Sequence, residues 1–299
     1  MNAARCVWIL SIIICVARGH VGNDIGQNQK EQETSADNST ESLSLVTAAN
    51  REFAFRLYRS LAANPDSQGK NIFFSPVSVS VALAALAVGA RGETHRQLFR
   101  GLAFNSTWLS QTDVDQAFQS LFEKTKKANE VTSEGTAVFM DNLFKPQPEF
   151  LDTLKKSYFA DGFNVDFTKS SESANTINKY VEEKTSGKID KLVESLDPAT
   201  VMYLISYIYF KGKWETLFDP DLTKEDLFMV DEKTKVVHQA TLDVDEAGAT
   251  AAAATGITIT LYSYYYVPVL KFNRPFMVII TEHSSDNILF MGKITNPNI

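Results

Sequence analysis

Residues 242–263 read LDVDEAGATAAAATGITITLYS. The stretch starts in a strand-like alternation, has only small side chains from Gly248 to Ala254, and resumes a β-branched alternation at Ile257. Small side chains let a backbone slip between two existing strands, and glycine permits a turn at the entry point. The composition also suits an ordinary helix, because alanine has the highest helix propensity, or a disordered linker. The stretch alone therefore leaves three alternatives open: a segment that inserts between strands, a helix, or a disordered linker.

Three other segments favour the first alternative. They are LKFNRPFMVII at 270–280, ILFMGKITNP at 288–297 and NIFFSPVSVSVALAALAVGARGETHRQL at 71–98. The first two resemble the C-terminal signature of the serpin family, in which FNRPF leads into a buried hairpin that ends in FMGKxxNP. The third resembles the family's FSPxSxxxALxxxxxGAxGxT segment. The resemblance covers almost all of residues 43–299.

The resemblance implies an α/β serpin-type fold, with helices packed around a large, mostly antiparallel central sheet and an exposed reactive-centre loop near the C-terminus. It implies a serine protease inhibitor that acts as a suicide substrate. The protease cleaves the loop, forms an acyl-enzyme at its own serine, and is distorted when the cut loop inserts into the main sheet as an extra strand. The hinge of that loop comprises Glu246, Gly248, Ala249, Thr250, Ala251, Ala252, Ala253 and Ala254. Its residues from Ala249 to Ala254 must stay small.

Two counts place the bond that the protease would cleave. Counting forward from Glu246 places it between Tyr262 and Ser263, whereas counting back from Phe272 places it between Tyr264 and Tyr265. A tyrosine before the bond suits an apolar specificity pocket. The expected partner is therefore an extracellular chymotrypsin-like or elastase-like serine protease.

The residues also predict a buried helix over 77–90, which is apolar nearly all round, with Ser75 as its cap and Pro76 at its first position. The resemblance places this helix under the central sheet, at the shutter that parts to admit the loop. The family positions of the shutter, and of the top of the sheet where the loop first enters, fall on Ser75, Ser78, Ser206, His238 and Trp214. Family members often carry Asn where Ser206 stands.

Apolar periodicity predicts the remaining elements. Helices are expected from Leu43 to the stop at Asn64-Pro65, and over 93–102, 112–126, 146–159 and 172–185. Strands are expected over 135–144, 162–167 and 200–210, the last buried on both faces because its apolar run is nearly continuous.

The N-terminus has the pattern of a secreted protein. Residues 1–19 form a predicted signal peptide, and the polar residues 20–42 a disordered leader. Both cysteines lie within the signal peptide, so the mature chain has no disulfide. Asn38 and Asn105 begin glycosylation sequons. We expect a secreted, monomeric glycoprotein.

Composition and motifs exclude several other classes. The net charge of −7 argues against nucleic-acid binding, and no later segment reaches the length of a membrane span. The four histidines, at 20, 95, 238 and 283, lie in no GxSxG, HExxH, CxxC or P-loop pattern. We therefore expect no enzyme activity, no cofactor and no metal site.

One part of the family pattern is missing. After LFMVDEKTKV at 227–236, family members continue for about a hundred residues before the strand that contains His238, whereas here the two segments join at 236/237. The sequence thus predicts a single domain over 43–299 that lacks part of the second and third sheets. The alternatives to an inhibitor are a non-inhibitory serpin-like binding protein and a truncated isoform without inhibitory activity.

Overall fold

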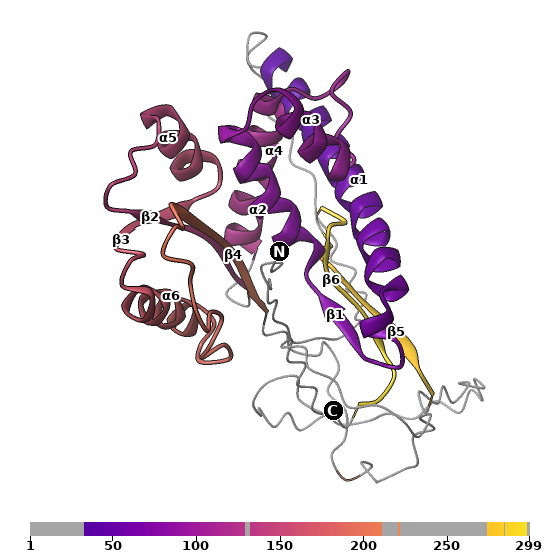
Figure 1. The fold of residues 1–299 in the computed structure, drawn as a ribbon. Coiled ribbons are helices and arrows are strands. Elements are labelled where there is room, and N and C mark those ends of the chain that lie inside the picture. The colour runs from indigo at the N-terminus through magenta and orange to yellow at the C-terminus, as the bar shows by residue number, and fades with distance from the viewer. Residues whose placement is uncertain (1–32, 129–131, 211–220, 222–273, 284, 298–299) are drawn as a thin grey trace, which may run out of the picture.

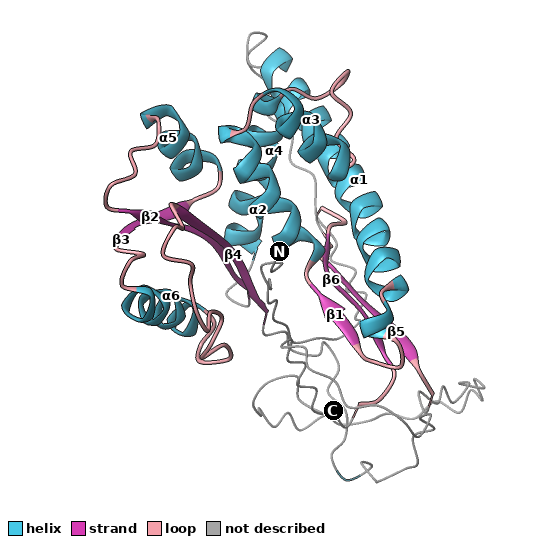
Figure 2. Ribbon diagram, in the orientation of Figure 1, coloured by secondary structure: helices cyan, strands magenta, loops and turns pink. Residues whose placement is uncertain are grey.

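The computed structural model describes residues 33–128, 132–210, 221, 274–283 and 285–297. The helices are α1 (Glu33–Ala63), the 3-10 turn η1 (Pro65–Ser67), α2 (Pro76–Gly89), α3 (Gly92–Gly101), α4 (Gln111–Ala128), α5 (Pro148–Ser157) and α6 (Ser170–Lys184). The strands are β1 (Ile72–Phe74), β2 (Thr132–Asp141), β3 (Ala160–Val165), β4 (Met202–Phe210), β5 (Phe276–Thr281) and β6 (Ile288–Ile294). Figures 1 and 2 show their arrangement.

The described strands form two sheets of three. In the order β3-β2-β4, β2 is parallel to β3 and antiparallel to β4, whereas the order β1-β6-β5 is antiparallel throughout. Helix α2 lies between the two sheets and contacts both β4 and β6, while α1 packs beside β6 (Figure 1). This α/β arrangement agrees with the fold class expected from sequence.

Strand β4 divides its side chains between two cores. Its even-numbered residues Met202, Leu204, Ile208 and Phe210 join the core formed with α1, α2 and α4, whereas its odd-numbered residues Tyr203, Ile205 and Tyr207 join the core formed with α6. The division follows from the two-residue period of a strand. Both faces of β4 are therefore covered by helices, as expected, although only Ile205 and Ile208 are fully buried.

The C-terminal segments form the expected hairpin. Strands β5 and β6 pair antiparallel, and the short β1 pairs with the other edge of β6. Gly292 on β6 lies against the backbone of Ile72 and the ring of Phe73, where a Cβ atom would have no room. Asn71 fixes the end of the sheet, because its Oδ1 accepts hydrogen bonds from Thr295 and Asn296 and its Nδ2 donates to the Asn296 carbonyl at 2.7 Å.

Helix α1 corrects one expectation. It begins at Glu33 rather than at residue 43, so the end of the predicted leader, residues 20–42, is helical. Residues 33–42 contain neither Gly nor Pro, and extending an existing helix adds one hydrogen bond for each residue fixed. The C-terminal end at Ala63, before Asn64-Pro65, is as predicted.

Strand β2 is shifted relative to its predicted range of 135–144. It begins at Thr132 and ends at Asp141. The carboxylate of Asp141 accepts a hydrogen bond from the Leu143 N–H at 2.9 Å, a local turn that ends the strand. Leu143 and Phe144 consequently lie outside the sheet with exposed side chains.

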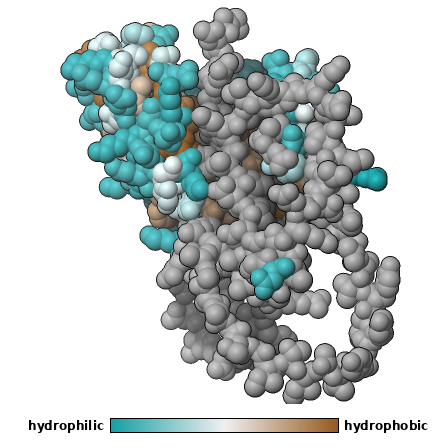
Figure 3. Space-filling model, turned by 90° about the horizontal axis from the view of Figure 1, so that it is seen from below, coloured by the Kyte–Doolittle hydropathy of each residue, from teal (hydrophilic) through white to brown (hydrophobic). Residues whose placement is uncertain are grey.

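No helix in the described part of the chain is both long and apolar enough to cross a bilayer. Seen from below, the described residues present a mostly hydrophilic surface with smaller apolar areas between (Figure 3).

Candidate functional site

The N-terminus of α2 carries the first predicted shutter residues. Ser75 caps the helix, since its Oγ accepts a hydrogen bond from the Ser78 N–H at 3.1 Å, and Pro76 occupies the first helical position. Ser75 is fully buried and Ser78 is 2% exposed. The capping prediction is confirmed, and it explains how the buried Ser75 hydroxyl is satisfied.

A second polar contact joins α2 to α1. The Ser80 hydroxyl donates to Asn50 Oδ1 at 2.5 Å, and both residues are buried. The Nδ2 group of Asn50 has no hydrogen-bond partner among the described residues. Leaving such a donor unsatisfied costs about 1–3 kcal/mol. The contact between α1 and α2 therefore includes a buried polar group that lacks a hydrogen bond.

Ser206 lies on the face of the sheet that packs against α2. It lies on β4 at an even position, the same side as Leu204 and Ile208, and opposite Thr136 on β2. Thr136 is 1% exposed, and its hydroxyl has no partner within the described part of the chain. Ser75 and Ser78 thus lie at the start of α2, a helix that packs against β4, and Ser206 lies on β4. We call these three residues, with Thr136, the shutter region.

Strand β4 presents an edge for a further strand. It pairs with β2 along one side only, and within the described ranges no strand pairs with its other side. Helices α2 and α6 cover its two faces. A strand added at this edge would extend the sheet by main-chain hydrogen bonds, the usual mode of β-strand addition.

The other predicted residues of the loop and the shutter lie outside the described residues. These are His238, Trp214, the hinge from Glu246 to Ala254, and both candidate bonds, Tyr262-Ser263 and Tyr264-Tyr265.

The two sequons differ in their setting. Asn105 is exposed in the turn between α3 and α4, where its Oδ1 accepts a hydrogen bond from the Thr107 N–H at 2.9 Å. Asn38 falls within α1, and its side chain lies outside the described residues. The setting of Asn105 is compatible with a surface glycan.

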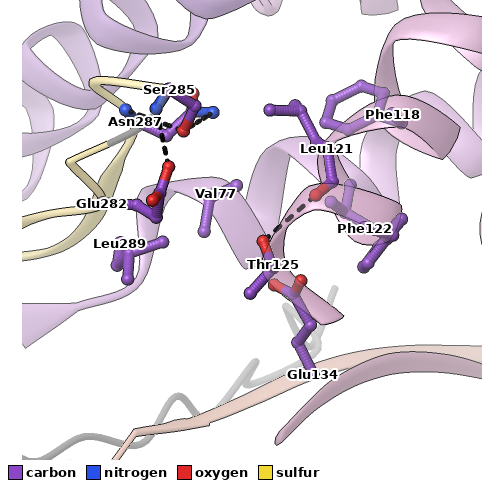
Figure 4. Close-up of a pocket in the computed structure, with 11 residues that line it drawn as sticks. Val77, Phe118, Leu121, Phe122, Thr125, Glu134, Glu282, Ser285, Asn287 and Leu289 are labelled. Carbon is purple, nitrogen blue, oxygen red and sulfur yellow. Dashed lines mark hydrogen bonds between the residues drawn. The ribbon is translucent and has the colours of Figure 1, made fainter. Parts of the chain in front are cut away.

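A pocket beside the shutter region was not predicted. Glu134 on β2 lines it together with Thr125 on α4 and Glu282 after β5 (Figure 4). Burial raises the pKa of Glu134 from its ordinary value of 4.5 to about 7, with a further contribution from the negative charge of Glu282, while a hydrogen bond with Thr125 acts in the opposite direction. The sequence around Glu134 reads TSEGTA and has no apolar alternation that would have marked it as part of a strand.

A second buried carboxyl group joins three helices. Asp115 on α4 accepts hydrogen bonds from the hydroxyl of Tyr158, next to α5, at 2.6 Å and from Gln111 at 2.7 Å. Gln111 also contacts His95 of α3 at 2.9 Å. Burial raises the pKa of Asp115, although these hydrogen bonds partly oppose the rise. The chain of contacts runs through the helical layer and does not reach the shutter region.

No group of three or more His, Cys, Asp or Glu side chains in the described residues is arranged to hold a metal ion.

Comparison with protein families identifies the family to which the chain belongs. The family model described as "Serpin (serine protease inhibitor)" matches residues 48–237 and 233–297. The two matched segments meet at the position where the sequence predicts the internal junction.

Individual relatives agree with the family model. The chain is 41% identical over 231 residues to alpha-1-antiproteinase of Callosciurus caniceps, which covers 76% of this chain and 55% of that protein. It is 28% identical to alpha-1-antitrypsin 1-4 of Mus musculus over 408 residues, 97% of each chain, an alignment longer than the 299 residues here and therefore with large gaps. The region aligned with alpha-1-antiproteinase thus spans about half the length of that relative.

Two solved structures share the fold. Human glycosylated kallistatin superimposes with a TM-score of 0.73 at 26% identity, over 86% of this chain and 99% of that one. Human thyroxine-binding globulin, solved with its hormone, superimposes with a TM-score of 0.74 at 24% identity, with the same coverage. The second similarity shows the fold alone.

Proposed function

This chain belongs to the serpin family, and from that premise we propose that it is a secreted serine protease inhibitor whose reactive-centre loop inserts into the sheet beside β4. The observation that carries the proposal is β4 itself. Its outer edge has no strand partner within the described residues, and both its faces are covered by helices. A loop strand added there would form main-chain hydrogen bonds with β4.

The shutter region supports the same proposal. Thr136 Oγ1 is buried without a partner in the described part of the chain. A layer with an unsatisfied polar group separates at a lower cost than a fully bonded or purely apolar one. In this proposal the layer between α2 and β4 opens while the loop inserts, and Ser75 and Ser206 contact the inserted strand from below.

The hinge supplies the moving element. Residues 248–254 have no side chain larger than threonine, so they would enter the sheet with little steric resistance. We propose Tyr262-Ser263, or alternatively Tyr264-Tyr265, as the cleaved bond and a chymotrypsin-like or elastase-like protease as the target. The protein itself would be no enzyme, since the protease supplies the nucleophile.

The test is incubation of the purified protein with chymotrypsin, elastase and trypsin, followed by electrophoresis in SDS. A covalent complex supports inhibition, and mass spectrometry of the released C-terminal peptide locates the bond. Ala251→Pro and Ala249→Arg should convert the inhibitor into a substrate, because each obstructs insertion. Ala251→Ser, which keeps the side chain small, is the matched control. Unchanged complex formation by Ala251→Pro and Ala249→Arg would refute insertion.

A second candidate is a folded serpin-like chain without inhibitory activity. It is favoured by the internal junction, where the two family-model matches meet at residues 233–237, and by the coverage of only 55% of alpha-1-antiproteinase. Cleavage within 261–265 without any covalent complex would select this candidate.

A further inference from the structure

Trp108 lies in the turn between α3 and α4 with most of its side chain in water. It is 68% exposed, the largest exposed fraction of any Phe, Trp or Tyr in the described part of the chain. The ring contacts of this region join His95, Phe99, Phe104 and Phe118 and do not include Trp108. Apolar surface left in water is unfavourable, so this indole ring is available to a ligand that covers it.

The turn that carries the ring is fixed at both ends. Phe104 and Leu109, which are 4% and 3% exposed, anchor it in the core. Beyond it, the Ser110 hydroxyl accepts a hydrogen bond from the Asp113 N–H at 3.2 Å, and the Asp113 carboxylate accepts one from the Ser110 N–H at 2.8 Å. This reciprocal pair is a capping box at the start of α4. The backbone of residues 105–108 is therefore held in one conformation.

That conformation brings Asn105 and Trp108 to the same side of the turn. The N–H groups of Trp108 and Leu109 both donate to the Asn105 carbonyl at 2.9 Å, as in one turn of helix. Side chains three residues apart in such a turn are neighbours, with Cβ atoms about 5–6 Å apart. Asn105 Oδ1 accepts a hydrogen bond from the Thr107 N–H at 2.9 Å. This bond orients the amide and leaves Nδ2, the atom that a glycan would modify, at the outer end of the side chain.

We propose that Trp108 is the binding surface for the first N-acetylglucosamine of a glycan on Asn105. The sequon starts at Asn105, and the inference rests on the secretory route of the proposed function but not on inhibition. A pyranose ring presents C–H groups on its faces, and their partial positive charge is attracted to the negative face of an aromatic ring.

Covalent attachment makes this weak contact effective. A sugar free in solution would have to bind the ring from bulk water, whereas a sugar attached three residues away meets it at a high effective concentration. The fixed turn also reduces the ordering cost of the contact. The glycan would thus cover Trp108 and stabilise the turn between α3 and α4.

The experiment compares two variants secreted from mammalian cells. Thr107→Ala removes the sequon but keeps Asn105 and the backbone N–H that orients it, whereas Thr107→Ser keeps the sequon and is the matched control. Hydroxyl-radical oxidation of Trp108 is measured by mass spectrometry after enzymatic release of the glycans. We expect oxidation to be about twofold slower in the glycosylated protein, because one of the two faces of the ring is covered. Leu143, which is 90% exposed, is the internal reference and should be oxidised equally in both.

A double-mutant cycle measures the coupling. Thermal unfolding should give a higher Tm for Thr107→Ser than for Thr107→Ala, and this difference should be lost when both also carry Trp108→Ala. Trp108→Phe, which keeps an aromatic face, should retain part of it. An unmodified Asn105 in the secreted protein, equal oxidation rates, or a glycan-dependent Tm that survives Trp108→Ala would each overturn the proposal. None of these readouts uses a protease, so a failure of inhibition would be recognised separately.

Discussion

Replacing Glu134 by Gln should make the protein more stable at alkaline pH. In the folded chain the pKa of Glu134 is about 7, against an ordinary value of 4.5. Between these two values the unfolded chain has released the proton while the folded chain still holds it. The free energy of unfolding therefore falls as pH rises through this window. The full difference corresponds to about 3 kcal/mol, a large part of the roughly 5–15 kcal/mol by which proteins are stable.

Glutamine is neutral at every pH and has nearly the shape of protonated glutamate. The variant should thus match the unchanged protein near pH 4.5 and exceed it by about 3 kcal/mol above pH 7. Urea unfolding in acetate and phosphate buffers measures the difference directly. Contributions from Asp115, whose pKa is also raised by burial, cancel because both proteins share them.

Glu149→Gln controls for the loss of one surface carboxylate, since Glu149 is exposed. A stability difference between Glu134→Gln and the unchanged protein that stays constant from pH 4.5 to pH 8 would refute the reasoning. So would an unchanged protein that gains stability relative to the variant above pH 7.

Three further substitutions test the packing of the helical layer and of the β1-β6-β5 sheet. Tyr158→Phe removes the hydroxyl that donates to buried Asp115 at 2.6 Å; it should lower the free energy of unfolding by about 1–3 kcal/mol, measured in urea, and an unchanged midpoint would contradict it. Asn71→Ala leaves the end of β6 without its acceptor and should cost about 1–3 kcal/mol, with faster amide exchange in β1 and β6 as the readout. Gly292→Ala places a methyl group against Phe73 and the β1 backbone; it should lower Tm by an amount equivalent to about 1–3 kcal/mol, and an equal Tm would show that the sheet accommodates it.

Sequence reasoning succeeded where the signal is local. The Ser75-Pro76 pair predicts the start of α2 because a capping hydroxyl and a fixed φ act within one turn. It failed where the environment comes from distant segments. Glu134 owes its raised pKa to burial against α4 and to Glu282, more than a hundred residues away in the chain. The end of β2 at Asp141 depends on a side-chain turn that apolar periodicity does not register.

The edge of β4 bears on whether a shortened serpin can still trap a protease. A strand inserted beside β4 alone gains main-chain hydrogen bonds along one side, whereas one that also pairs with the strand predicted around His238 gains them along both. Each such bond contributes only about 1 kcal/mol net. Because β4 has nine residues, pairing along a second side adds several such bonds. Together they change the free energy of insertion more than any single side chain does. In the proposed inhibitory mechanism, insertion must also precede hydrolysis of the acyl-enzyme. The ratio of covalent complex to cleaved product therefore measures how completely this chain has kept the second side of its acceptor sheet.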